Sequence, residues 1–148
     1  MITLLQLEWF GGDKHALEAC NMLIRVANTW DDLIDKDKEV PNEKINEAFK
    51  LCAIYLPMNP FYRRIQNEVL PMLITVTAAF DVANHYEQQK DEHGLEIAHN
   101  LRYALGHVFA YAIHVCVGPH KAAEYLPLMW KVITPDRFAD YRAEHLDA

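Results

Sequence analysis

Residues 13–36 read DKHALEACNMLIRVANTWDDLIDK, and their apolar side chains recur with the spacing of an α-helix. The recurring positions alternate steps of four and three residues: Ala16, Cys20, Leu23, Ala27, Trp30 and Ile34. Such spacing places one apolar stripe along a single helical face. Asp13 belongs to the residue types that cap helix N-termini. The segment therefore predicts a helix over about residues 14–36.

Helical periodicity continues along the chain, and proline and asparagine mark where the later helices begin and end. The further predicted helices cover about residues 42–56, 60–89, 95–117, 120–132 and 136–146. Pro71 lies inside the third helix, where its missing N–H predicts a kink or a break. Strand signals are nearly missing. Short connections favour antiparallel neighbours, so we predict an all-α fold: a single-domain antiparallel helical bundle of four long helices plus two shorter C-terminal helices.

The composition limits the classes of protein to consider. A chain of 148 residues has the length of one domain, which we expect to cover residues 1–148 with an N-terminal arm at 1–12. The net charge of -7 argues against nucleic-acid and anionic-membrane partners. No apolar run reaches the length of a membrane span, and three cysteines in apolar surroundings are typical of reduced core thiols. We therefore expect a cytoplasmic protein without a membrane or nucleic-acid partner.

The end of the first predicted helix concentrates carboxylates in the segment DDLID, residues 31–35. Asp31 falls within the apolar stripe, Asp35 lies on its flank one turn later, and Asp32 faces the edge. A helix C-terminus already carries partial negative charge, so these carboxylates favour a cation opposite them. Two carboxylates one turn apart suit Mg²⁺, which otherwise takes water or phosphate oxygens. The segment predicts Asp31 and Asp35 as metal ligands, with Asp32 as a bridging or outer carboxylate.

DDLID resembles the aspartate-rich DDxxD motif of class I isoprenoid (terpene) synthases, which holds the Mg²⁺ that binds a substrate diphosphate. A second segment, NHYEQQKDE at residues 84–92, is similar to the NDxxSxxxE metal motif of terpene cyclases, since Asn84, Gln88 and Glu92 follow each other at steps of four. His85 stands where that motif has aspartate, and Gln88 replaces its hydroxyl ligand. The resemblance covers two short pieces of a chain that is much smaller than the family's members.

The resemblance implies a Mg²⁺-binding acidic site for a diphosphate-bearing small molecule, with or without turnover. The side chains that would hold the metal come from both motifs: Asp31, Asp35, Asp32, Asn84, Gln88 and Glu92. Arg25 and Arg102 are candidates for contacts to the diphosphate, because guanidinium groups bind phosphate oxygens in pairs. If chemistry occurs, it would be metal-assisted departure or hydrolysis of diphosphate.

Two alternatives remain open. A non-catalytic helical interaction module would bind a protein partner, or form a homo-oligomer, through its apolar N-terminal arm MITLLQLEWF and its aromatic C-terminal helices. The expected burial of Asp31 argues against such a module, which has no evident reason to bury a carboxylate. The second alternative is an enzyme resembling the all-α nucleotide pyrophosphatases, which are Mg²⁺-dependent and carry acidic pairs on neighbouring helices. Asp32/Asp35, Glu43/Glu47 and Asp81 with Asn84 approximate that arrangement but match neither of its pairs.

Overall fold

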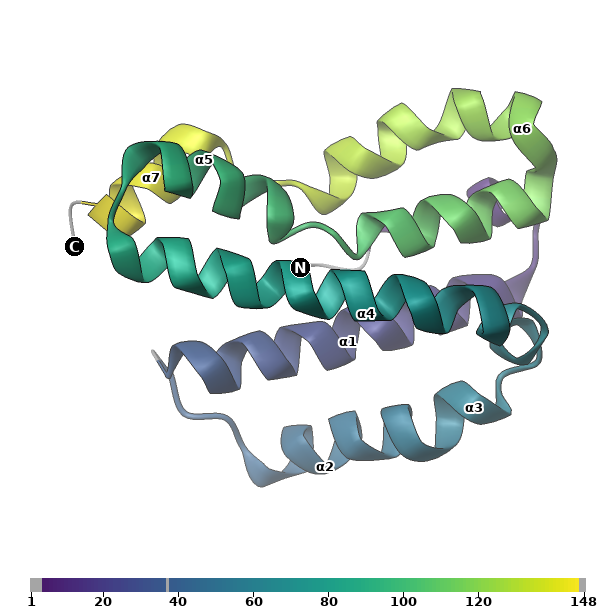
Figure 1. Cartoon of the computed structure of the whole chain (residues 1–148). Coiled ribbons are helices and arrows are strands. Elements are labelled where there is room, and N and C mark those ends of the chain that lie inside the picture. The colour runs from purple at the N-terminus through teal and green to yellow at the C-terminus, as the bar shows by residue number, and fades with distance from the viewer. Residues whose placement is uncertain (1–3, 37, 147–148) are drawn as a thin grey trace. The chain divides into compact units, whose positions relative to one another are not determined.

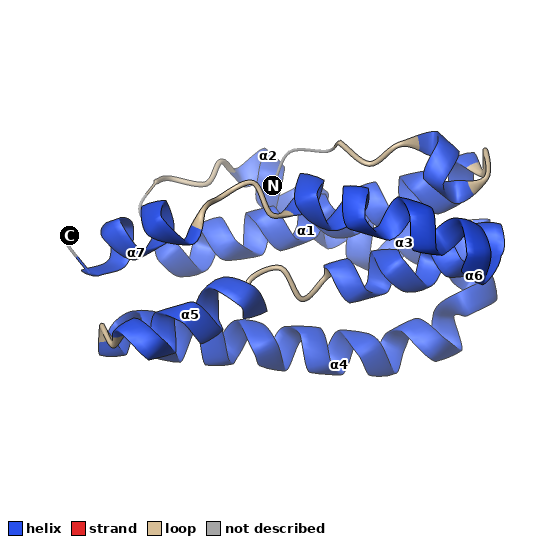
Figure 2. Ribbon diagram, turned by 90° about the horizontal axis from the view of Figure 1, so that it is seen from above, coloured by secondary structure: helices blue, strands red, loops and turns tan. Residues whose placement is uncertain are grey.

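A computed structural model describes residues 4–36 and 38–146, and these residues are almost entirely helical (Figures 1 and 2). The elements are, in chain order, the 3₁₀-helix η1 (Leu7–Phe10), α1 (Lys14–Asp35), α2 (Asn42–Lys50), the π-helical η2 (Leu51–Tyr55), α3 (Leu56–Met58), α4 (Pro60–Gln89), α5 (Glu92–Leu101), α6 (Gly106–Ile133) and α7 (Phe138–Leu146). The described ranges contain no strand, and none of their helices has the length and apolar composition needed to cross a membrane. The all-α prediction is confirmed.

The chain divides into two compact units, residues 1–66 and 67–148, with the division inside α4. In the first unit, α1 and the continuous run α2–η2–α3 lie side by side and antiparallel (Figure 1). In the second unit, α5 packs against α7. Each unit is described by itself below, and the assignment of residues 1–148 to a single domain stays a prediction.

The first helix begins and ends where its sequence pattern predicts. The Asp13 carboxylate accepts hydrogen bonds from the backbone N–H groups of His15 and Ala16 at 3.0 and 3.1 Å. These bonds satisfy two of the donors that a helix N-terminus leaves unpaired. At the other end, Lys36 adopts a left-handed backbone with φ of 58°, which stops the helix after Asp35.

Asn59 joins three elements of the first unit. Its side-chain oxygen accepts a hydrogen bond from the Tyr62 N–H at 2.9 Å and so caps the start of α4. Its side-chain nitrogen donates to the His15 carbonyl oxygen in α1 at 3.0 Å. Asn59 is only 4% exposed, and its bond with the Tyr62 N–H is buried, whereas its bond to His15 is partly buried. The end of α3 is thereby fixed against the beginning of α1.

The expected set of four long helices followed by two shorter ones is wrong in the C-terminal part of the chain. The predicted helix at 95–117 is divided, because α5 ends at Leu101 and a turn precedes α6 at Gly106. A Cβ atom on Gly106 would lie 2.5 Å from side-chain atoms of both Trp130 and Ile133. The start of α6 therefore packs closely against its own end, a tertiary contact that helical periodicity does not encode.

Two other boundary predictions have opposite outcomes. Gly118 has a non-helical backbone with φ of 80° and ψ of 171°, so the predicted break between residues 117 and 120 is confirmed inside the element labelled α6. The predicted kink or break at Pro71 does not interrupt α4, which is continuous from Pro60 to Gln89. Pro71 is exposed, so water can reach the carbonyl that loses its partner there.

Gly106→Ala tests the close packing within α6. The added methyl group must displace Trp130 and Ile133, and we expect the free energy of unfolding to fall by about 1–3 kcal/mol. Urea unfolding followed by circular dichroism measures this change. Adding Ile133→Val removes the opposing Ile133 Cδ1 atom and should recover part of the loss. A stability that Gly106→Ala leaves unchanged would contradict the contact.

Candidate functional site

The acidic end of α1 carries its three carboxylates in different environments. Asp31 and Asp32 are half-buried, whereas Asp35 is exposed. The Lys38 ammonium lies 3.3 Å from the Asp32 carboxylate, and the last turn of α1 contains no basic residue. Across residues 4–36 and 38–146, no three Asp, Glu, His or Cys side chains are grouped closely enough to hold a metal ion. Protein ligands for Mg²⁺ at this end would therefore be a pair of carboxylates rather than a closed cage.

The second predicted motif is divided between two helices. Asn84 and Gln88 lie on α4, but Glu92 begins α5 after a turn at Lys90, where φ is 54°. The Asn84 side-chain oxygen accepts a hydrogen bond from Arg102, and the Glu92 carboxylate accepts one from Arg142 Nε at 2.8 Å. Gln88 is exposed. Two of the three proposed ligands are thus bonded to guanidinium groups.

Both arginines proposed for substrate binding have acidic partners within the chain. Arg25 Nε lies 3.3 Å from the Glu47 carboxylate, and both side chains are about half exposed. Arg102 is bonded to Glu87 as well as to Asn84. The first motif with Arg25 belongs to residues 1–66, and the second motif with Arg102 belongs to residues 67–148.

Glu87 is the centre of a polar cluster in the second unit that sequence patterns did not identify. Its carboxylate accepts two hydrogen bonds from Arg102, the one from Nε at 2.9 Å, and a third from the Tyr141 hydroxyl. His145 Nε2 lies 3.6 Å from the same carboxylate. The side chains of Glu87 and Arg102 are only 12% and 15% exposed. Arg102 and Tyr141 are 15 and 54 residues from Glu87 along the chain, so no local motif connects them.

Electrostatics explain why this cluster is stable at neutral pH. Burial raises the pKa of the Glu87 carboxyl. The hydrogen bonds and charge of Arg102 and the hydrogen bond from Tyr141 lower this pKa by a larger amount, so the net pKa is below its usual value. Burial and the adjacent carboxylate raise the pKa of the Tyr141 hydroxyl, which keeps its proton to donate. The cluster connects α4 to α7, a helix of nine residues that is too short to be stable alone. The cluster therefore has a structural role. We call Glu87 and its partners Arg102 and Tyr141 the clamp.

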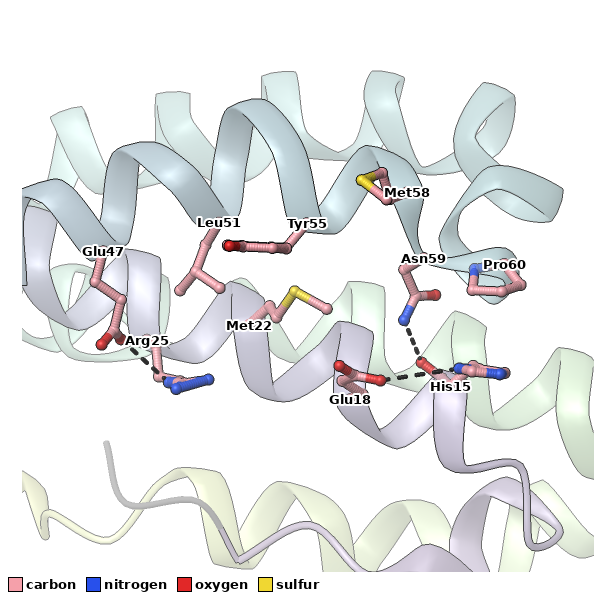
Figure 3. Close-up of a pocket in the computed structure, with 10 residues that line it drawn as sticks. All are labelled: His15, Glu18, Met22, Arg25, Glu47, Leu51, Tyr55, Met58, Asn59 and Pro60. Carbon is pink, nitrogen blue, oxygen red and sulfur yellow. Dashed lines mark hydrogen bonds and ion pairs between the residues drawn. The ribbon is translucent and has the colours of Figure 1, made fainter.

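A groove of about 460 Å³ lies between α1 and the run α2–η2–α3 (Figure 3). Met22, Leu51 and Tyr55 provide apolar surface along its middle. The Arg25–Glu47 ion pair lies at one end, and His15 lies with Glu18 and Asn59 at the other. Its volume falls within the range of ligand-binding clefts.

The run α2–η2–α3 exposes large apolar side chains around much of its circumference. The five exposed large side chains, with their exposed fractions, are Phe49 (70%), Met58 (66%), Tyr55 (52%), Ile54 (43%) and Ile45 (38%). Its last eight residues, LCAIYLPM at 51–58, contain no charged side chain, and only Leu51 and Leu56 among them are buried. Surface helices usually carry charged or polar residues on the face opposite the core. This run lacks such a face over its C-terminal half.

The described part of the predicted N-terminal arm is folded. Leu5, Trp9 and Phe10 are buried, and η1 is followed by a turn at Gly11 and Gly12. Leu4 is 54% exposed. Residues 1–3 lie outside the described ranges. A homo-oligomer formed through this arm stays a prediction, although most of the large apolar side chains in its described part are buried within the chain.

Comparisons of this chain with known protein families, with curated proteins and with solved structures find no match. The resemblance to isoprenoid synthases thus rests on the two sequence motifs alone.

Glu87→Gln tests the clamp. Removing the charge leaves Arg102 buried without its counter-ion, and we expect the free energy of unfolding at pH 7 to fall by about 3 kcal/mol. Because the Glu87 pKa is lowered by folding, its contribution is present above the unfolded-state pKa and disappears as the pH falls through the folded-state pKa. The difference between wild type and variant should therefore shrink in acid, as measured by urea unfolding at a series of pH values.

Glu92→Gln is the matched control for this prediction. Glu92 also accepts a hydrogen bond from an arginine, but its side chain is 59% exposed. We expect a loss below about 1 kcal/mol, since exposed ion pairs contribute little. Equal effects of the two substitutions would contradict the assignment of Glu87 as the buried centre of the cluster.

Proposed function

We propose that this chain is a helical interaction module that binds a protein partner through the outer surface of α2–η2–α3. We call this surface the uncharged surface and define it by five exposed residues: Phe49, Ala53, Ile54, Pro57 and Met58, the last of which also lines the groove. The observation that carries the proposal is the absence of any charged side chain from residues 51–58, six of which are exposed. Exposed apolar patches of this kind mark interaction sites in folded proteins.

The energetics of exposure support the same proposal. Burial of a large apolar side chain stabilises a protein by about 1.5–3 kcal/mol, so leaving several such side chains in water forgoes a substantial free energy. The run is already held against α1 by the buried Leu51 and by the bond from Asn59 to His15. The apolar residues on its outer side therefore contribute little to folding of the first unit, and binding a partner gives them a role.

Paired glutamine substitutions test whether the uncharged surface is uncovered. In dilute solution, Ile54→Gln with Met58→Gln should change the free energy of unfolding by no more than about 0.5 kcal/mol, as at other exposed sites. Binding of a fluorescent apolar dye should fall. Leu56→Gln, at a residue only 5% exposed in the same helix, is the control and should cost several kcal/mol. A large loss in the paired variant would mean that the surface packs within the chain and would overturn the proposal.

The acidic end of α1 supports a second proposal: a Mg²⁺-dependent site for a diphosphate-bearing small molecule. Asp31 and Asp35 lie one turn apart at a helix C-terminus whose last turn has no basic residue. A pair of carboxylates is sufficient for Mg²⁺ when phosphate oxygens and water complete its octahedron. The bound ion would neutralise charge that develops on a departing diphosphate. The pyrophosphatase alternative has less support, because Glu47 of its acidic pair is bonded to Arg25.

Thermal unfolding with Mg²⁺, with and without inorganic diphosphate, tests this second proposal. Ligand at about 100 times its dissociation constant stabilises a folded protein by about 2.7 kcal/mol, which raises the midpoint by several degrees. We expect this shift in wild type and in Glu68→Gln, at an exposed glutamate on α4, and its loss in Asp31→Asn. Wild type that shows no shift with diphosphate and Mg²⁺ together would refute a site at this end of α1.

A further inference from the structure

We infer that the partner of the uncharged surface is a second copy of this chain, bound across a twofold axis; the inference rests on the proposed interaction module and names its partner. Closed twofold dimers are the commonest oligomers of soluble proteins. In such a dimer the same surface meets itself, so it must be complementary to itself in charge, shape and area.

The charge distribution favours a second copy at this surface. The whole chain has a net charge of -7, so most pairings of two copies bring like charges together. The run at residues 42–58 is an exception, because its charged side chains are two acidic and two basic: Glu43, Lys44, Glu47 and Lys50. Residues 51–58 add none. Two copies can therefore approach along this run without net repulsion.

The arrangement of side chains suits the packing of one helix against its own copy. Ile45, Phe49, Ala53 and Pro57 follow each other at steps of four residues, and Ile54 and Met58 form a neighbouring row with the same step. Rows of this kind are the ridges that interdigitate in the commonest class of helix packing. Ala53 between larger side chains leaves a depression that a ridge of the partner can enter. The surface can thus accept an identical surface.

The exposed apolar area matches what a stable dimer needs. From their exposed fractions, Phe49, Met58, Ile54 and Ile45, with the exposed Ala53 and Pro57, together present on the order of 500 Å² of surface. A standard interface buries about 800 Å² on each partner, of which somewhat more than half is apolar. The apolar share of one standard interface is therefore available on this single helical run.

Sedimentation equilibrium of the full chain, over a concentration series from micromolar to submillimolar, tests the inference. We expect wild type to approach twice the monomer mass of 17.1 kDa. Met58→Glu and Ile54→Glu, tested separately, each place like charges opposite each other across the axis and should weaken the dimer by more than about 100-fold. The matched control is Ile74→Glu on α4, where the side chain is 70% exposed, and it should dimerise like wild type. Circular dichroism at the lowest concentration checks that each variant is folded.

The exposed Cys52 beside this surface gives a second measurement. In a Cys116→Ala background, with Cys20 buried, a short thiol cross-linker should join two chains through Cys52. Adding Met58→Glu should remove the cross-linked product, and Cys52→Ala serves as the blank. Product that forms equally with Met58→Glu would show random collision and would count against the dimer.

The outcomes separate this inference from the proposed function. Wild type that stays monomeric at the highest concentration overturns the second copy as partner, while the dye-binding result with Ile54→Gln and Met58→Gln still decides whether the surface is an interaction surface. A dimer that survives both glutamate variants uses another surface and overturns the inference. A dimer lost equally in Ile74→Glu overturns it as well, because the effect would then be one of net charge.

Discussion

The buried side-chain amide of Asn59 is the interaction on which the arrangement of the first unit depends. One bond starts α4, and the other holds the end of α3 to the first turn of α1. The Tyr62 bond is buried, so removing the amide would leave that backbone N–H unsatisfied at the start of α4, and it would also remove the contact with the His15 carbonyl oxygen. Because Asn59 fixes one end of α2–η2–α3, it also sets which side of that run faces α1 and which side faces outward. The groove and the uncharged surface are the two consequences.

The second unit depends on a charged interaction in place of an amide. Glu87 and its partners Arg102 and Tyr141 come from three separate segments, and the carboxylate satisfies donors from both others. Around it, the Tyr141 ring packs with Ala83, Leu95 and Ala98. A buried ion pair gives little net stability compared with apolar packing, but it is costly to break and specifies one arrangement. It therefore explains why a nine-residue helix has a fixed place in this unit.

The two proposed functions use different parts of the first unit. The groove and the uncharged surface involve the first half of α1 and the run α2–η2–α3, whereas the metal proposal involves the last turns of α1. Neither proposal requires the other to be correct. The contacts of Arg25, Arg102, Asn84 and Glu92 change how the sequence motifs are interpreted, because each of these side chains already has a polar partner within the chain. The metal proposal therefore rests on the spacing of Asp31 and Asp35 at the end of α1, and the interaction proposal rests on an apolar surface that no motif had indicated.

The sequence by itself determined the helical class, the cap at Asp13, the limits of α1 and the turn at Gly118, since periodicity, capping and glycine conformation act over a few residues. It did not determine the division between α5 and α6, which depends on the packing of Gly106 against Trp130 and Ile133. Nor did it reveal the Glu87 cluster, because the partners of that carboxylate are distant along the chain.

The same limit applies to the candidate site. Sequence spacing placed Asn84, Gln88 and Glu92 in one motif, but a turn at Lys90 and two arginines from other segments decided their contacts. Only the tertiary structure shows which apolar residues of a helix are covered. The exposed surface at residues 49–58 could therefore not be identified from the sequence.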